Sequence, residues 1–328
     1  MKVVVTGGAG FIGSHYVRSL CTGLYPAWAD AQVVVLDALT YAGHRENLAS
    51  VEGRFTWAVG DIVDRDHVND VLTGADVVVH FAAESHVDRS IHGADVFVRT
   101  NVLGTQTLLD AARAHGVNRF VHVSTDEVYG SIPEGSWPET HPLEPNSPYA
   151  ASKASSDLFV RAAHRTHKLD TVITRCSNNY GHYQTPEKVI PLFVSNLLDG
   201  STVPLYGEGL NVRDWLHVDD HCRGIQLVAE GGRSGEVYNI GGGTELTNRE
   251  LTQRLLDALG ADWETSVVQV EDRLGHDLRY SVDITKISEE LGYRPQVDFT
   301  EGLKATVEWY RDNRDWWEPL KASLTPAR

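Results

Sequence analysis

The segment Thr6-Gly7-Gly8-Ala9-Gly10-Phe11-Ile12-Gly13 decides the fold. It follows an apolar, β-branched run at residues 2–6 and leads into apolar residues at helical spacing over residues 10–21. Glycines at such a junction allow a tight turn and let a pyrophosphate approach the backbone. The helix that follows offers free N–H groups and the positive end of its dipole. A glycine loop placed between a strand and a helix predicts a dinucleotide-binding site.

The rest of the first half alternates between strands and helices. We expect strands at residues 32–37, 55–59, 76–80, 119–124 and 171–175, and helices at residues 64–72, 94–115 and 149–167. Near-continuous apolar strands separated by helices indicate a parallel sheet that is covered on both faces. The predicted fold class is therefore α/β, with a doubly wound, Rossmann-type parallel sheet.

The second half alternates less regularly. Helices are expected at residues 187–198, 218–230 and 248–259, joined by loops rich in Gly and Pro. We predict a dinucleotide-binding domain at residues 1–175. Residues 176–328 are expected to form a smaller α/β region that mainly binds substrate and is interwoven with the first. Ligands of doubly wound sheets bind outside the carboxyl ends of the strands, so this second region should cover that cleft.

The composition limits the possible partners. The chain has 328 residues, of which 41% are hydrophobic and 23% charged, as in ordinary globular proteins. Its formal net charge of −16 disfavours binding to nucleic acid or to an anionic membrane, and its apolar runs are too short to cross a bilayer. Cys21, Cys176 and Cys222 lack the spacing of a disulfide framework, which is typical of reduced thiols in the cytoplasm. The histidines lack the spacing of a zinc site, so we expect no metal.

An acidic residue ends the second expected strand. A carboxylate at Asp37 can accept hydrogen bonds from both ribose hydroxyls of NAD, and it would repel the 2′-phosphate of NADP. Asp61 and Ile62 follow the third strand, where an adenine edge would lie, although an ordinary turn explains this pair equally well. The sequence therefore predicts NAD as the cofactor.

Two pairs of side chains predict chemistry near the strand ends. Tyr149 and Lys153 share one face of a helix, so that a lysine ammonium can lower the pKa of the phenol and make it a usable base. Asp126 and Glu127 lie just past the strand that ends at Ser124. Two carboxyl groups in different environments can act separately as acid and base.

Motifs along nearly the whole chain carry a family resemblance. They are TGGAGFIG (6–13), AAESHVDRS (82–90), STDEVYG (124–130), SPYAASKAS (147–155), RCSNNYG (175–181), PEKVIP (186–191), VRDWLHVDD (212–220) and DRLGHDLRY (272–280). Together they resemble the dTDP-glucose 4,6-dehydratases, a family of extended short-chain dehydrogenases, and the Thr-Asp-Glu triplet is the most discriminating segment. The chain departs from the family pattern at Phe81, Val189 and Leu274, where the family has Leu, Leu and Pro.

The resemblance implies a lyase that converts dTDP-glucose into dTDP-4-keto-6-deoxy-glucose and water with bound NAD. Tyr149 would take the proton of the sugar C4 hydroxyl as C4 is oxidised, with Lys153 beside it. Glu127 would remove the C5 proton, and Asp126 would protonate the departing C6 hydroxyl before hydride returns to C6. Thr125 would hydrogen-bond the C4 oxygen.

The resemblance also assigns the binding residues and a partner. Cofactor contacts are implied for Gly7, Gly10, Phe11, Ile12, Gly13, Asp37, Ala38, Leu39, Thr40, Asp61, Ile62, Phe81, Ala82, Ala83, Ser85, Thr100, Ser124, Tyr149, Lys153 and Asn179. Substrate contacts are implied for Ser85, Thr125, Asn178, Lys188, Val189, Pro204, Tyr206, Arg213, Asn248, Arg273 and His276. A homodimer is implied, in which the helices at 94–115 and 149–167 of each subunit form a four-helix interface that buries Leu103, Leu108 and Phe159.

Two other functions remain open at this stage. An NAD-dependent sugar-nucleotide epimerase or decarboxylase of the same fold would need no acid for a C6 hydroxyl, so Asp126 argues against it. A dinucleotide-binding sensor without catalysis would be expected to lack Tyr149, Lys153 or Glu127, and all three are present.

Overall fold

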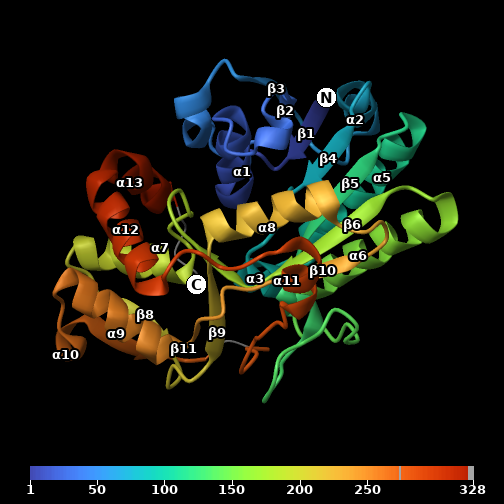
Figure 1. Cartoon of the computed structure of the whole chain (residues 1–328). Helices are drawn as coiled ribbons and strands as arrows, with labels where there is room; N and C mark the ends of the chain where they lie inside the picture. Colours follow the sequence, from blue (N-terminus) through green and yellow to red (C-terminus); the bar gives the residue numbers. More distant parts are fainter. Residues whose placement is uncertain (273–274, 324–328) are drawn as a thin grey trace.

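A large parallel sheet organises the molecule (Figure 1). The computed structural model describes residues 1–272 and 275–323. In the sheet the strands run in the order β10-β6-β5-β4-β1-β2-β3, and every neighbouring pair is parallel. Their bounds are β1 (Lys2–Thr6), β2 (Gln32–Asp37), β3 (Phe55–Val59), β4 (Val77–His80), β5 (Arg119–Thr125), β6 (Thr171–Cys176) and β10 (Val237–Ile240). This arrangement confirms the predicted fold class.

Helices cover both faces of the sheet, because successive side chains of each strand point to opposite faces. Val3 and Val5 of β1 belong to a core cluster with α1 (Phe11–Cys21), α8 (Val218–Gly231) and α11 (Thr285–Leu291). Val4 belongs to a second cluster with α2 (Arg65–Leu72), α5 (Thr105–Ala114) and α6 (Pro148–His167). Figure 1 shows α8 in front of the strands and α6 beyond them.

The helical stretch expected at residues 94–115 is built from three pieces. They are α4 (Asp95–Phe97), a π-helical segment η3 (Val98–Gly104) and α5. At Gly104 the backbone packs against Ile62, where an added Cβ would lie 2.5 Å from Ile62 Cδ1. A π-helical segment inside a helix often accompanies a functional site, and this one places Thr100 at the cavity described below.

The second half forms two smaller sheets and contributes to the large one. β7 (Asn178–Tyr180), β9 (Val212–His217) and β11 (Glu245–Thr247) form one sheet, and β8 (Val203–Tyr206) pairs with β12 (Val267–Val270). Around them lie α7 (Val189–Leu198), α9 (Asn248–Leu259), α10 (Trp263–Ser266), α12 (Phe299–Asp312) and α13 (Arg314–Ser323). The division into domains at residue 175 stays a prediction, and β10, α8 and α11 lie beyond it in sequence but against the large sheet.

Short elements complete the described chain. They are η1 (Pro26–Trp28), η2 (Arg45–Val51), α3 (Val87–His92) and the 3-10 turn η4 (Asp126–Tyr129). The helices of the described residues include none that is both long and apolar enough to cross a bilayer. One packing prediction is wrong: Leu108 points into the second core cluster and is fully buried within the subunit, so it is not available to an interface.

Candidate active site

Two adjoining cavities open at the carboxyl ends of the strands. The first has a volume of about 340 Å³ and the second, between the large sheet and the second half, about 1060 Å³. Glu127, Asn178 and Lys188 lie in the walls of both cavities, so the two adjoin. The first cavity is lined by all five predicted catalytic residues and by every predicted cofactor residue except Leu39.

The glycine loop forms the floor of the first cavity. Gly7 has φ of +68°, and a Cβ there would lie 2.5 Å from the Ala82 nitrogen. At Gly13 a Cβ would lie 2.2 Å from the Gly7 oxygen, so the first turn of α1 can approach the loop only with glycine. Gly10 caps α1 without a side-chain hydrogen bond, which leaves the first N–H groups of the helix for a ligand. A diphosphate fits these donors.

Asp37 ends β2 and lines the first cavity at the point where the chain turns after the strand. Its Oδ2 accepts a bond from Ala9 N at 2.9 Å, and its Oδ1 accepts one from Leu39 N at 2.8 Å. These bonds hold the carboxylate in one orientation and oppose the effect of burial, which raises its pKa. Leu39 itself, with φ of +51°, makes this turn rather than lining the cavity.

The turn after β5 carries the two carboxyl groups. Thr125 Oγ1 accepts a bond from Glu127 N at 3.2 Å and donates one to Asp126 Oδ1 at 3.3 Å. Asp126 is only 2% exposed, and its Oδ2 is buried without a hydrogen-bond partner among the described residues. Burial, with the nearby carboxylates of Glu127 and Asp214, raises the pKa of Asp126 well above its usual value. The protonated form of Asp126, which has a proton to give, is therefore favoured.

Tyr149 and Lys153 lie on α6, which packs against this turn. Burial, followed by the charge of Glu127, raises the pKa of Tyr149 well above 10. The expectation that the charge of Lys153 lowers this pKa stays a prediction, and in the protein alone the effect of burial dominates. Lys153 Nζ donates to Val123 O at 2.8 Å, and burial lowers its pKa to about 8. Lys153 is still mainly charged at pH 7.

A buried ion pair lies next to Lys153. Asp157, one turn further along α6, accepts a bond at 2.8 Å from Nε of Arg175 on β6. Burial would raise the pKa of Asp157, but Arg175, His122 and Ser124 together outweigh it and the pKa falls to about 2. Arg175 also donates at 2.8 Å to the hydroxyl of Tyr129, which ends the turn that carries Asp126. The charge of Asp157 opposes the effect of burial on Lys153.

The second cavity gathers the predicted substrate residues. Its lining includes Asn178, Lys188, Val189, Pro204, Tyr206, Arg213, Asn248 and His276, whereas Ser85 and Thr125 lie in the first cavity. Arg213 is 5% exposed and donates to the carbonyls of Val212 at 2.7 Å and Asp277 at 2.9 Å. His276 Nδ1 lies 2.6 Å from Asp272 Oδ1. Arg273 and Leu274 lie outside the described residues.

Sequence reasoning missed a set of contacts in the walls of the two cavities. The guanidinium of Arg89 lies 3.9 Å from the ring centroid of Tyr41 and pairs with Glu187 at 2.9 Å. The Tyr41 hydroxyl donates to Glu84 at 2.9 Å. Arg89 and Glu84 belong to the quoted segment 82–90, and Glu187 to 186–191, so the motifs pointed to the region but not to these contacts.

Comparisons with known proteins agree over the whole chain. Residues 4–306 match the family described as GDP-mannose 4,6 dehydratase. The dTDP-glucose 4,6-dehydratase of Streptomyces niveus is 61% identical over 98% of this chain and 96% of its own length. That of Streptomyces antibioticus is 63% identical, with the same coverage of each chain.

Solved structures of dTDP-glucose 4,6-dehydratases also resemble this chain. The dTDP-glucose 4,6-dehydratase DesIV of Streptomyces venezuelae, solved with NAD bound, is 67% identical with a TM-score of 0.96, covering 98% of this chain and 100% of its own. The dTDP-glucose 4,6-dehydratase of Bacillus anthracis, in complex with NAD, is 44% identical with a TM-score of 0.89, covering 98% and 99%. A UDP-glucose 4-epimerase of Thermotoga maritima is 33% identical with a TM-score of 0.88, and the match covers 96% of this chain and 100% of the epimerase. With identities above 60% over nearly the whole length of its relatives, this chain belongs to the dTDP-glucose 4,6-dehydratases.

Proposed function

We propose that this enzyme converts dTDP-glucose into dTDP-4-keto-6-deoxy-glucose and water with NAD as a bound cofactor. One observation carries the proposal: a buried carboxyl group at Asp126, whose pKa burial raises, adjoins Glu127 in the same cavity as Tyr149 and Lys153. The site thus combines a redox base with an acid and a base for elimination. An epimerase of this fold has no step that consumes the proton of Asp126.

The first cavity suits NAD along its whole length. The free N–H groups of α1 and the closely packed glycines suit the diphosphate, and the oriented carboxylate of Asp37 suits the two ribose hydroxyls. Asp61 and Ile62 line the wall near Asp37, as an adenine pocket requires. When bound, NAD supplies reversible oxidation of the sugar. The negative charge of Asp37 disfavours the 2′-phosphate of NADP.

The chain's own residues supply the proton transfers. Tyr149 accepts the C4 hydroxyl proton, Lys153 favours the phenolate by its charge, and the Thr125 hydroxyl donates to the C4 oxygen. The C4 ketone makes the C5 proton acidic, so Glu127 removes it, and later returns it. Asp126 gives its proton to the C6 hydroxyl, which leaves as water. Tyr149 has then gained one proton and Asp126 has lost one, so the site as a whole keeps its proton count.

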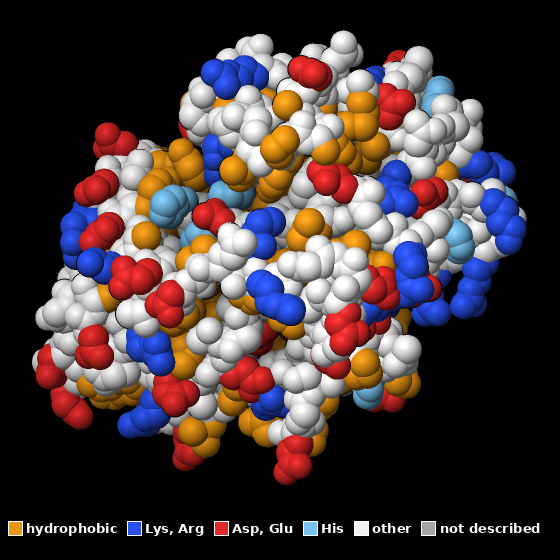
Figure 2. Space-filling view, in the orientation of Figure 1, with side chains coloured by type: hydrophobic (Ala, Val, Ile, Leu, Met, Phe, Trp, Pro, Cys, Tyr) orange, Lys and Arg blue, Asp and Glu red, His pale blue; other side chains and the backbone are white. Residues whose placement is uncertain are grey.

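Basic side chains in the second cavity suit the diphosphate of the substrate. Acidic side chains are spread over the face of the molecule in Figure 2, and the net charge of −16 repels a nucleotide sugar at long range. Lys188, Arg213 and His276 line the cavity where they can offset this repulsion. Two backbone carbonyls hold the Arg213 guanidinium in place, so its binding geometry is set before substrate arrives. Tyr206 and Asn248 lie in the same wall and suit the base.

A direct assay tests the proposed function. The purified protein is incubated with dTDP-glucose, UDP-glucose and GDP-mannose, and the 4-keto product is followed by its absorbance in alkali. We expect turnover of dTDP-glucose and recovery of NAD, not NADP, from the denatured protein. A 4-epimer without loss of water would contradict the proposal, and would favour the epimerase instead.

We also propose a homodimer formed by η3, α5 and α6. Val98 and Leu103 on η3, with Leu158 and Phe159 on α6, are large apolar side chains, and each is more than 40% exposed in the single chain. A surface of this kind on two adjacent helices is typical of an obligate interface. A monomer in light scattering at micromolar concentration would contradict it.

The three free cysteines suit a cytoplasmic location, which fractionation of cells would test.

A further inference from the structure

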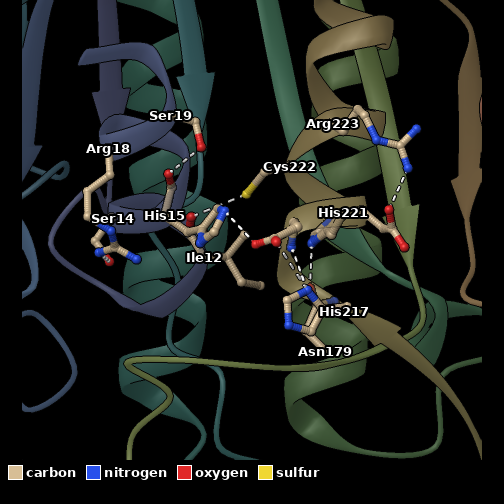
Figure 3. Close-up of polar contacts among 12 residues, drawn as sticks. Ile12, Ser14, His15, Arg18, Ser19, Asn179, His217, His221, Cys222 and Arg223 are labelled. Carbon is tan, nitrogen blue, oxygen red and sulfur yellow. Dashed lines mark hydrogen bonds and ion pairs between the residues drawn. The ribbon is translucent and has the colours of Figure 1, made fainter. Parts of the chain in front are cut away.

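A fully buried histidine holds one side chain of the cofactor cavity in place. His221 lies on α8, and its Nδ1 is 2.9 Å from Oδ1 of Asn179 on β7 (Figure 3). Asn179 lines the first cavity with Cys176 and Ser177, at the end that also holds Tyr149. His221 is not part of that lining, and the proposed chemistry gives it no task.

The hydrogen bonds fix both the amide and the tautomer of the imidazole. Asn179 Nδ2 donates to Ser177 O at 2.9 Å and to Cys176 Sγ at 3.5 Å, so its Oδ1 must be the atom that faces His221. An amide oxygen only accepts, and therefore Nδ1 of His221 carries the proton. Burial keeps the ring neutral by lowering its pKa to about 3. Nε2 then carries only a lone pair.

This histidine is poorly suited to a purely structural role. Its Nε2 is buried without a hydrogen-bond partner among the described residues, and leaving a buried polar atom unpaired costs stability. Leucine would fill the same space without that cost. The one polar bond that the structure gives the ring, among residues 1–272 and 275–323, goes to Asn179.

The helix that carries His221 also touches the other end of the cofactor cavity. Cys222, the next residue, lies with Sγ 3.6 Å from the carbonyl of Ile12 in the first turn of α1. His15 of α1 pairs with Asp219 at 3.0 Å. Figure 3 shows these contacts side by side, with α1 on one side and α8 on the other. α8 is therefore held against the diphosphate loop while His221 reaches Asn179.

We infer that His221 is a positioning residue, which orients the Asn179 amide to bind the nicotinamide end of NAD in one arrangement. The inference rests on the proposed function, because it takes NAD as the occupant of the first cavity. With its oxygen bonded to His221 and its nitrogen bonded to Ser177 and, over a longer distance, to Cys176, the Asn179 amide presents a fixed surface to the ligand instead of sampling several rotamers. A pre-oriented group binds more tightly because its freedom is not lost on binding.

The test measures how fast holoenzyme exchanges bound NAD for labelled NAD in solution. His221→Leu keeps the volume but cannot donate to Asn179, and we expect exchange to be about 3- to 10-fold faster, the value of one hydrogen bond. His221→Asn places an N–H near the position of Nδ1, and should restore slow exchange. With saturating NAD, kcat of both variants should stay near that of the wild type.

Controls separate positioning from folding. His217→Ala removes a neighbouring histidine whose ring accepts a hydrogen bond from Asp219 N at the start of α8, and not from Asn179. We expect it to lower the melting temperature without faster NAD exchange. In an Asn179→Ala background, His221→Leu should have no further effect on exchange.

Three results would overturn the inference. They are a wild-type exchange rate in His221→Leu, equal losses in His221→Leu and His221→Asn, and a His221→Leu protein that does not fold. A wild-type protein that binds no NAD would overturn the proposed function together with this inference. Normal NAD binding by the wild type, with unchanged exchange in His221→Leu, would overturn the inference alone.

Discussion

Asp126→Asn should separate oxidation of the sugar from loss of water. The amide has nearly the same shape as the acid, and its oxygen can still accept the 3.3 Å bond from Thr125, so the turn should keep its structure. What disappears is the acidic proton, which burial and the neighbouring carboxylates favour on Asp126 by raising its pKa. C4 oxidation does not use this proton, whereas departure of the C6 hydroxyl does.

The size of the effect follows from the burial of the acid. One general acid contributes roughly 100- to 10,000-fold to a rate, which corresponds to about 3 to 5 kcal/mol of activation free energy. Asp126 is 2% exposed and its Oδ2 has no partner among the described residues, so neither bulk water nor a neighbouring donor replaces it readily. We therefore expect a loss of about 1,000-fold or more in turnover, in the upper part of that range.

Two measurements resolve the steps. In single-turnover experiments, the absorbance of NADH should rise at the wild-type rate and then persist, because elimination is blocked. Exchange of the C5 proton with deuterated water should continue, since Glu127 is intact. As a matched control, Glu139→Gln replaces another carboxyl group whose pKa burial raises, outside both cavities, and should turn over normally. Unimpaired turnover by Asp126→Asn would refute Asp126 as the acid.

Three further changes test other parts of the site. Tyr149→Phe should abolish even the transient rise of NADH, because no base remains for the C4 hydroxyl; a normal rise would exclude Tyr149 from that role. Gly13→Ala places a Cβ 2.2 Å from the Gly7 oxygen, so the purified protein should contain little NAD, and full occupancy measured by chromatography would contradict the close packing described here. Lys153, whose pKa burial lowers to about 8, loses its positive charge as pH rises through that value, so the rate of C4 oxidation should fall above about pH 8; a rate that stays flat to pH 10 would show that this charge is not needed.

Local patterns predicted the parts of the fold that are local in sequence. The strand, glycine loop and helix at residues 2–21 form as expected, because turn chemistry and apolar periodicity act over a few residues. Asp37 and the turn that carries Asp126 and Glu127 follow predicted strand ends, and a parallel sheet brings such ends to one edge. The cavity accordingly gathers nearly all the residues that the motifs indicated.

Features that depend on residues far apart in the sequence were not predicted. β7 and β11 have only three residues each, and β9 pairs with both across long stretches of chain, so no periodicity marks them. The π-helical segment η3 has only seven residues, too few for its sequence to show a period different from that of an α-helix. The pKa of Tyr149 depends on burial and on Glu127, which lies far from it in sequence. The contacts of Arg89 join three separate segments.

The edge strand β10 has a consequence for how the protein is synthesised. β10 pairs with β6 from Val237↔Ile173 to Ile240↔Cys176, although sixty residues, 177–236, separate the two strands in sequence. A nascent chain that has reached residue 175 therefore carries β6 as an open edge, and lacks the apolar side chains of α8 that cover one face of the sheet. Exposed strand edges and uncovered apolar faces promote aggregation. The first half of this enzyme should thus depend on a chaperone, or on rapid translation of the second half, until β10 pairs with β6 and α8 covers the exposed face.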